Sequence, residues 1–498
     1  MSLHPYNDNT KRISIIQRSN NMAAKEFIVA IELGSSKITG IAGKKSMDGS
    51  IQVLAVVKED ATFCIRKGVV YNIDKTCACL TNIIKKLKKT LKSEISKVYV
   101  GVGGQSIRSI RNTILKTLPE DGIITQEMLN ELMDNNRSTY YPDLEILDAA
   151  TLEYKVGTQY QVDPVGILSN KIEGNFLNIV CRKAFFRNLN KCFEKANITI
   201  ADMYLAPIAL ADSVLTDAEK RSGCLLVDMG ADTTTVSVYF KNILRHLAVI
   251  PLGGNDITKD ITSLMMEENE AEEMKVKYAT AYTEPAETNT QKTLPIDDER
   301  SVSVQTFNEL VEARINEIIQ NVWFGQVPPE YNNKLLGGII LTGGGSNMKD
   351  IKKAFTAITG IQKIRIADTV RQKVSFNDKN INAHDGMMNT ALGLLAKGDI
   401  NCAGSTIQPA TDLFAPENRP NTTVTDTPRP QNSKHDVTVQ EKPSTQKPNQ
   451  TSERPNRNTP NHPKDKRKGN WFSKGFNYLQ ELGLAIITAE GEEDDDKR

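Results

Sequence analysis

Two stretches of the same design stand far apart in this chain: "AIELGSSKITG" (Ala30 to Gly40) and "LVDMGADTTTV" (Leu226 to Val236). Each runs from apolar residues through an acid, one apolar residue and a glycine into small polar residues and a second apolar run. This pattern is typical of two strands joined by a tight turn. Its repetition predicts an α/β protein with two duplicated halves.

A turn of this composition is well suited to bind a phosphate group. Glycine lets the backbone approach closely, and turn N–H groups and hydroxyls can donate to phosphate oxygens. Glu32 and Asp228, near the ends of the first strands, would face each other and could hold a hydrated Mg²⁺ that bridges phosphates. Either hairpin alone is more often an ordinary glycine turn. The paired pattern favours a clamp with nucleotide phosphates between two loops.

A third stretch, "ILTGGGSNMKDI" (Ile340 to Ile351), reads as a strand, a glycine turn and the start of a helix. Its backbone N–H groups would be aimed at a nucleotide. A lone run of three glycines is usually only a turn. Because this run follows two phosphate-type hairpins, it supports the nucleotide interpretation.

Composition narrows the class of protein. The chain has 498 residues, 39% hydrophobic and 25% charged, which predicts a soluble protein of more than one domain. A net charge of +1 offers no global attraction for nucleic acid. The seven cysteines and five histidines lack metal-ligand spacing and are predicted to be reduced thiols and ordinary histidines. Neither a signal peptide nor an apolar run long enough to span a bilayer is expected.

The order of phosphate hairpin, phosphate hairpin and glycine-rich adenosine loop resembles that of the actin, sugar-kinase and heat-shock-chaperone superfamily. The stretches "SVLTDAEKRSGCLLVDMGADTTTVSVY", "RHLAVIPLGGNDITKDI" and "GIILTGGGSNMKDI" look most like the bacterial cell-division family FtsA. The resemblance covers about Glu26 to Gly398 and the C-terminal tip. It implies an actin-like fold whose two halves surround a nucleotide cleft, with ATP and Mg²⁺ as ligands.

Carried over position by position, the resemblance implies three loops and one pair of side chains around the nucleotide. The first phosphate loop would consist of Gly34, Ser35, Ser36 and Lys37. The second would consist of Gly230, Ala231, Asp232, Thr233 and Thr234, and the adenosine loop of Gly343, Gly344, Gly345 and Ser346. Glu272 and Lys275 would bind the ribose and adenine, although an i,i+3 ion pair on a helix explains them equally well.

One departure bears on turnover. Hydrolysing members of the superfamily usually carry Gln or Glu on the connecting helix to orient the attacking water. The matching stretch "MYLAPIALADSV" has Ala206-Pro207-Ile208 at that place. We therefore expect tight ATP binding with slow or negligible hydrolysis, and nucleotide state acting as a conformational signal. Whether the chain is an enzyme stays open.

The resemblance also orders the chain into parts. Residues 105–180 resemble the relocated subdomain by which FtsA differs from actin. The other predicted parts are a disordered leader (1–25), the first half in two pieces (26–104 and 181–222), the second half with the adenine- and FtsZ-binding subdomain (223–402), a disordered linker (403–469), an amphipathic helix (470–489) and an acidic tail (490–498).

The stretch "NWFSKGFNYLQELGLAIITAE" would place its apolar residues on about half of a helix circumference. Those assigned to the membrane are Trp471, Phe472, Phe476, Leu479, Leu482 and Ile486. Following a basic cluster on a disordered tether, such a helix indicates an in-plane membrane anchor, and FtsA ends this way. Docking on the protein's own body or on a partner is the alternative, which the acidic tail slightly favours.

Together the resemblance implies a protein that tethers FtsZ filaments to the cytoplasmic face of the inner membrane at the division septum. Self-association into actin-like filaments and contacts with later divisome proteins are implied as well. The FtsZ C-terminal tail is expected on the segment matching Ser301 to Ile319, where Glu309 and Arg314 lie, although a surface ion pair is an alternative role for both.

Two rivals share the hairpins. A phosphotransferase would need an acidic base facing the phosphoryl acceptor, and no acid stands in a matching motif. A pilus-assembly or rod-shape relative would usually lack the long linker and the anchor helix.

Overall fold

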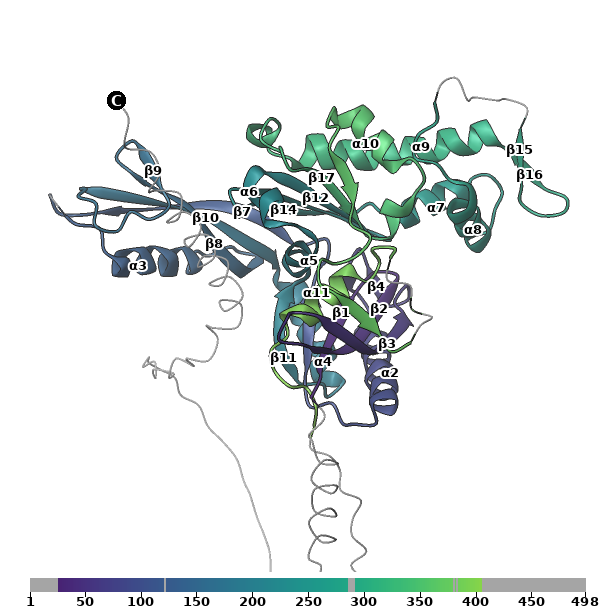
Figure 1. Cartoon of the computed structure of the whole chain (residues 1–498), viewed down its shortest axis with the longest axis horizontal. Coiled ribbons are helices and arrows are strands. Elements are labelled where there is room, and N and C mark those ends of the chain that lie inside the picture. The colour runs from purple at the N-terminus through teal and green to yellow at the C-terminus, as the bar shows by residue number, and fades with distance from the viewer. Residues whose placement is uncertain (1–25, 121, 285–291, 379–380, 382–383, 405–498) are drawn as a thin grey trace, which may run out of the picture. The chain divides into compact units, whose positions relative to one another are not determined.

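In the computed structural model, the described part of the chain comprises residues 26–404 without residues 121, 285–291, 379–380 and 382–383. The predicted leader, the linker from residue 405 onward, the amphipathic helix and the acidic tail lie outside the described residues. Figure 1 labels the helices and strands discussed below.

The first half is built on a six-stranded sheet with the order β11-β6-β1-β2-β3-β19. These strands are β1 (Ile28–Leu33), β2 (Lys37–Lys45), β3 (Ile51–Asp60), β6 (Val98–Val102), β11 (Ile200–Leu205) and β19 (Val374–Phe376). The β1 strand runs antiparallel to β2 and parallel to β6. Its apolar side chains are buried, as expected for a strand covered by helices on both faces.

The second half repeats this arrangement at one end of a nine-stranded sheet with the order β18-β17-β12-β13-β14-β7-β10-β8-β9. The repeated strands are β12 (Cys224–Met229), β13 (Thr234–Phe240), β14 (Ile243–Ile250), β17 (Gly338–Thr342) and β18 (Ile364–Ile366). The β12 strand is antiparallel to β13 and parallel to β17. Since β1 and β12 hold equivalent positions, the predicted duplication of α/β halves is confirmed.

The inserted subdomain continues the sheet of the second half (Figure 1). It contains β7 (Arg108–Thr117), α3 (Gln126–Arg137), β8 (Leu144–Val156), β9 (Gln159–Gln161) and β10 (Lys171–Arg182). The junction is the pairing of Ala248 on β14 with Arg108 on β7. The insert has its own small core, in which Leu129 and Leu132 of α3 pack near Phe176 of β10.

Helices cover both sheets. Those of the first half and the connection are α2 (Ile73–Leu91), α4 (Lys183–Lys195), α5 (Ala206–Val214), α6 (Asp217–Ser222) and α11 (Asn389–Lys397). Those of the second half are α7 (Gly254–Thr262), α8 (Glu268–Tyr278), α9 (Val304–Gln320) and α10 (Ile351–Thr359). No helix within the described ranges is both long enough and apolar enough to cross a bilayer.

Short elements complete the fold. They are β4 (Ile65–Arg66), β5 (Val69–Val70), β15 (Thr293–Pro295), β16 (Ser301–Ser303), a π turn (Asn321–Gln326) and 3₁₀ turns at Pro329–Tyr331 and Gly344–Asn347. Local capping explains where α2 begins, because the Asn72 side chain accepts a hydrogen bond from the N–H of Lys75. On the buried face of α2, Leu80, Ile83 and Leu87 follow helical spacing.

The insert depends on a buried amide pair. Asn136 of α3 and Asn178 of β10 are fully buried and exchange hydrogen bonds of 2.7 and 3.0 Å. We predict that Asn178→Ala lowers the free energy of unfolding by about 1–3 kcal/mol, because the buried Nδ2 of Asn136 loses its acceptor. Urea unfolding of the full chain measures this. The matched control is Thr113→Ala, which removes an exposed hydrogen bond to Asn175 in the same sheet. Equal losses in the two variants would contradict the prediction.

Candidate nucleotide site

The two repeated hairpins have the same turn geometry. The N–H of Gly34 donates to the carbonyl of Lys37 at 3.1 Å, and the N–H of Gly230 donates to the carbonyl of Thr233 at 2.8 Å. A Cβ on Gly34 would lie 2.8 Å from that carbonyl oxygen, and a Cβ on Gly230 would lie 2.9 Å from its counterpart. Both positions therefore require glycine because the chain closes on itself too tightly for a side chain.

The acids two residues before these glycines, Glu32 and Asp228, both have raised pKa values. Burial, and next the charge of Asp228, raise the pKa of Glu32 to about 8, against a smaller opposite effect of Lys58. Burial raises the pKa of Asp228 to about 6. Each residue keeps partial solvent exposure, so both can still reach a ligand. Two neighbouring carboxyls with raised pKa values fit a divalent cation, whose charge would favour their ionised forms.

The described residues hold no cluster of three or more His, Cys, Asp and Glu side chains suited to a metal. A magnesium ion between Glu32 and Asp228 would therefore need water and phosphate oxygens as its remaining ligands, which is how Mg²⁺ usually binds.

The glycine-rich loop packs on the end of β12. Gly343 has φ +82°, and a Cβ there would lie 2.4 Å from Oδ1 of Asp228. A Cβ on Gly345 would lie 2.9 Å from the Cβ of Met229. This loop thus lies directly against the second hairpin. Ser346 is buried and its hydroxyl donates to the carbonyl of Gly343 at 2.7 Å, so it closes the loop on itself.

Glu272 and Lys275 form the ion pair that was the alternative to ligand binding, with 2.6 Å between Oε2 and Nζ. The pair is not simply solvated, because the Lys275 side chain is only 12% exposed. Lys275 also donates to the carbonyl of Gly254 at 3.1 Å and to the Thr258 hydroxyl at 2.8 Å. The N–H of Gly254 donates to the carbonyl of Gly230. Gly254 therefore connects this ion pair to the second hairpin turn, because it hydrogen-bonds to both Lys275 and Gly230.

The remaining loop residues differ in their exposure to solvent and in their hydrogen-bond partners. Thr234 is buried at the start of β13 and its hydroxyl donates to the carbonyl of Leu252 at 2.9 Å. Lys37 is exposed, and Ser36 is partly exposed. Asp232 accepts a hydrogen bond of 2.8 Å from the Asn255 side chain. Ala231 accepts one from the N–H of Asn255 at 2.7 Å.

Glu309 and Arg314 lie on α9 with separate partners. Glu309 is exposed and accepts a hydrogen bond from Gln305 at 2.8 Å. Arg314 donates to both oxygens of Asp260 on α7 at 2.6 and 2.9 Å, and it also contacts Glu317. The ion-pair alternative thus describes Arg314, which ties α9 to α7.

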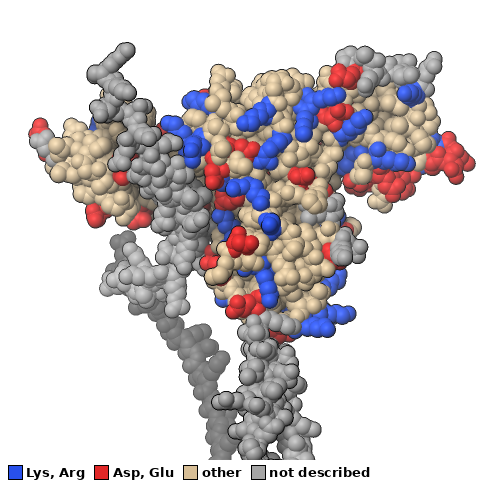
Figure 2. All heavy atoms as spheres, viewed as in Figure 1, with Lys and Arg blue, Asp and Glu red and all other residues tan. Residues whose placement is uncertain are grey.

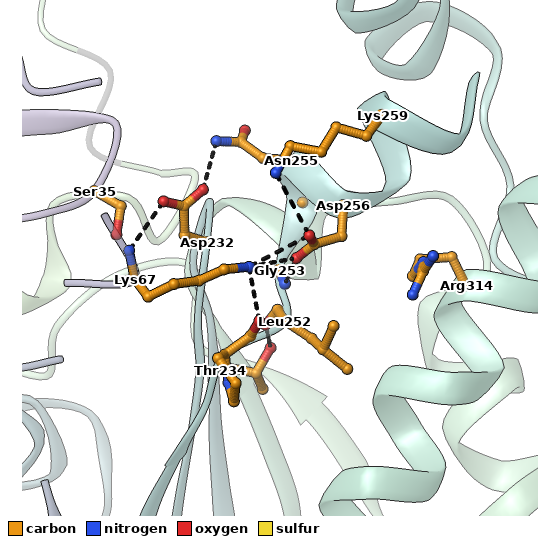
Figure 3. A network of polar contacts seen from close by, with 12 residues as sticks. Ser35, Lys67, Asp232, Thr234, Leu252, Gly253, Asn255, Asp256, Lys259 and Arg314 are labelled. Atoms are coloured by element: carbon orange, nitrogen blue, oxygen red, sulfur yellow. Dashed lines mark hydrogen bonds and ion pairs between the residues drawn. The ribbon is translucent and has the colours of Figure 1, made fainter. Parts of the chain in front are cut away.

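The structure adds residues that the sequence reasoning missed. The two-residue turn of Lys67 and Gly68, between β4 and β5, hydrogen-bonds to both predicted phosphate loops. Figure 3 shows the contact of Lys67 with Asp232. Asn255 and Asp256 at the start of α7 complete the network. The pattern "IRKGVV", with Lys-Gly between short apolar pairs, could have indicated a hairpin turn. Its partners in the second half had no signal in the sequence.

Comparison with known proteins identifies related families and relatives of this chain. The family model described as "Cell division protein FtsA" matches residues 225–393, and the model "SHS2 domain inserted in FTSA" matches residues 104–180. The chain is 31% identical over 336 residues to the cell division protein FtsA of Porphyromonas gingivalis, covering 66% of this chain and 70% of that protein. It is 30% identical to that of Neisseria meningitidis serogroup B, covering 66% and 80%.

This chain belongs to the FtsA family of cell-division proteins. The FtsA protein of Escherichia coli K12 is 25% identical over 387 residues, covering 75% of this chain and 90% of that protein. Among solved structures, the PilM-PilN type IV pilus biogenesis complex aligns with a TM-score of 0.52 at 16% identity, covering 74% of this chain and 97% of that one. That likeness concerns the fold alone. The actin-like α/β fold with an FtsA-type inserted subdomain is confirmed.

The raised pKa of Glu32 makes stability depend on pH. Between its ordinary pKa of 4.5 and its folded value of about 8, the folded state holds a proton that the unfolded state has lost, so stability falls as pH rises through this range. We predict that Glu32→Gln reduces the drop in unfolding temperature between about pH 6.5 and 8.5 by a few degrees. Scanning calorimetry without divalent ions measures this.

The control is Glu131→Gln, an exposed acid on α3, which should keep the wild-type slope. Added Mg²⁺ should raise the unfolding temperature of the wild type near the upper end of this range more than that of Glu32→Gln. An identical pH slope in wild type and Glu32→Gln would contradict the raised pKa of Glu32.

Proposed function

We propose that this chain binds ATP with Mg²⁺ and tethers FtsZ filaments to the cytoplasmic face of the inner membrane at the division septum. The observation that carries the nucleotide part is the pair of equivalent turns at Gly34 and Gly230, with the neighbouring acids Glu32 and Asp228 beside them. The FtsA family supports the cell-division part.

In this proposal the turn amides of Gly34–Lys37 and Gly230–Thr234 surround the phosphates. Glu32 and Asp228 hold Mg²⁺ through water, and the ion supplies charge compensation when bound. Gly343, Gly344 and Gly345 approach the nucleoside, because their lack of side chains leaves the backbone accessible. Lys275 and Glu272 flank the second loop from α8 and offer polar groups to the ribose and adenine.

Slow hydrolysis at most is part of the proposal. The connecting segment at the start of α5 presents Ala206, Pro207 and Ile208, none of which can orient water. Binding without fast turnover would let the nucleotide act as a stable conformational signal.

For FtsZ we propose docking on α9. Glu309 is exposed there, whereas Arg314 is engaged with Asp260. Exposed acids gather on α8 and on the β15–β16 hairpin that leads into α9 (Figure 2); they are Glu267, Glu268, Glu273, Asp297, Asp298 and Glu299. We therefore expect the FtsZ tail to present basic side chains to this face. Self-association into filaments and contacts with later divisome proteins follow from the family as further proposals.

The nucleotide proposal predicts that Asp228→Asn weakens binding of a fluorescent ATP analogue by about 10-fold or more in the presence of Mg²⁺, a loss of about 1.4 kcal/mol. Because Asn keeps the shape of the side chain, the loss reports the charge and not the packing. Titration of the purified full chain measures it, with Glu131→Gln as the control. An unchanged affinity, or no binding by the wild type, would sink the proposal.

The membrane proposal predicts that the full chain floats with vesicles of anionic phospholipid in ATP and Mg²⁺, whereas a chain ending at Gly469 stays in the load fraction. The reason is that residues 470–489 would supply the apolar face that enters the bilayer. FtsZ added to both should float only with the full chain. If neither chain floats, the tip is a docking helix and the tether is wrong. If the full chain floats but the added FtsZ stays in the load fraction, only the recruitment of FtsZ is disproved.

A further inference from the structure

The turn of Lys67 and Gly68 contacts one residue in each predicted phosphate loop; Figure 3 shows the Lys67 side of this arrangement. The N–H of Gly68 donates to Oγ of Ser35 in the first loop at 2.8 Å. The N–H of Lys67 donates to Oδ2 of Asp232 in the second loop at 3.2 Å. Two neighbouring amides of this turn therefore bridge the two loops.

The Lys67 side chain extends the same contact to the start of α7. Its Nζ donates to the carbonyl of Pro251 at 2.7 Å and lies 3.2 and 3.3 Å from the two oxygens of Asp256. The side chains of Lys67 and Asp256 are 28% and 14% exposed, so solvent screens this ion pair only partly. Asp256 also accepts the N–H of Gly253 at 2.9 Å, which anchors its carboxylate.

The backbone at Lys67 indicates that its side chain matters. Lys67 has φ +50° and Gly68 has φ +72°, as in the tight hairpin turns that favour Asn-Gly. For a lysine the left-handed region is unfavourable, because the Cβ lies too close to the following carbonyl oxygen. Such a conformation persists where surrounding contacts fix it, and here those contacts are the carbonyl of Pro251 and the carboxylate of Asp256.

We propose that Lys67 is a positioning residue, whose ion pair with Asp256 latches the first half to α7 and fixes the spacing of the two phosphate loops. This inference rests on the proposed nucleotide site for its effect on ligand release. When the latch is closed, the loops are held at one separation before a ligand arrives. Loss of the latch lets the loops separate, which accelerates release more than it slows binding.

The test uses variants of the full chain that keep shape and change charge. Lys67→Met keeps the length of the side chain, and Asp256→Asn keeps an acceptor for the N–H of Gly253. Lys259→Met is the matched control, because Lys259 lies 3.7 Å from the same carboxylate but is 59% exposed and within α7. Lys67→Arg is the conservative variant, since arginine keeps the positive charge that Lys67→Met removes.

Amide hydrogen exchange of the nucleotide-free protein measures directly whether the Lys67–Asp256 ion pair holds the two loops. Lys67→Met and Asp256→Asn should each accelerate exchange about 10-fold in peptides covering residues 65–70 and 230–234, and the double variant should add little. Lys259→Met should leave both peptides unchanged, and Lys67→Arg should recover most of the protection. Unchanged exchange at residues 230–234 in Lys67→Met would overturn the latch.

The dissociation rate of a fluorescent ATP analogue, in the presence of Mg²⁺, measures the effect of Lys67 on ligand release. Lys67→Met should release it about 10-fold faster, while Lys259→Met keeps the wild-type rate. Faster exchange with an unaltered release rate would overturn the positioning role. If the wild type binds no analogue while exchange responds as expected, the nucleotide proposal fails and the structural latch stands, so the two failures are distinguishable.

Discussion

Two carboxyls near the ends of equivalent strands, Glu32 from the first half and Asp228 from the second, stand close enough that the charge of Asp228 adds to burial in raising the pKa of Glu32. Burial alone raises the pKa of Asp228. The two acids stand at equivalent strand ends, so the duplicated fold itself forces them together. Other acids around the loops already have partners, since Asp232 binds Asn255 and the Lys67 N–H while Asp256 binds Lys67. Glu32 and Asp228 are therefore the acids at which the charge of a cation bound with an anionic ligand would have the largest effect.

The α7 helix connects this centre with the rest of the second half. Its first turn accepts Lys67 through Asp256, and one turn later Asp260 binds Arg314 of α9. Lys275 of α8 holds the carbonyl of Gly254 at the same end. The predicted phosphate loops and the helix proposed to receive FtsZ are thus both attached to one short helix. This attachment is a contiguous physical route along which loop spacing could bias α9.

The sequence predicted those features that are local or repeated. The acid-x-Gly pattern identified both hairpins, and the repetition identified the two halves, because strand and turn chemistry are written within a few residues. Side-chain direction was not readable: the hydroxyls of Ser346 and Thr234 turn to backbone carbonyls of their own surroundings. The pair of Lys67 and Asp256 was missed because its members lie 189 residues apart and no local pattern links one to the other.

The insert shows why the Lys67 turn is placed as it is. In sequence the insert follows β6 of the first half, yet its sheet is joined to β14 of the second. Its first residue, Gln105, donates its N–H to the carbonyl of Lys67 at 2.9 Å. Glycines at 68 and 104 permit this approach, since a Cβ on Gly68 would lie 2.5 Å from the Cα of Gly104. The turn therefore contacts both halves and the insert, and a movement that opened the phosphate loops would also have to displace the start of the insert.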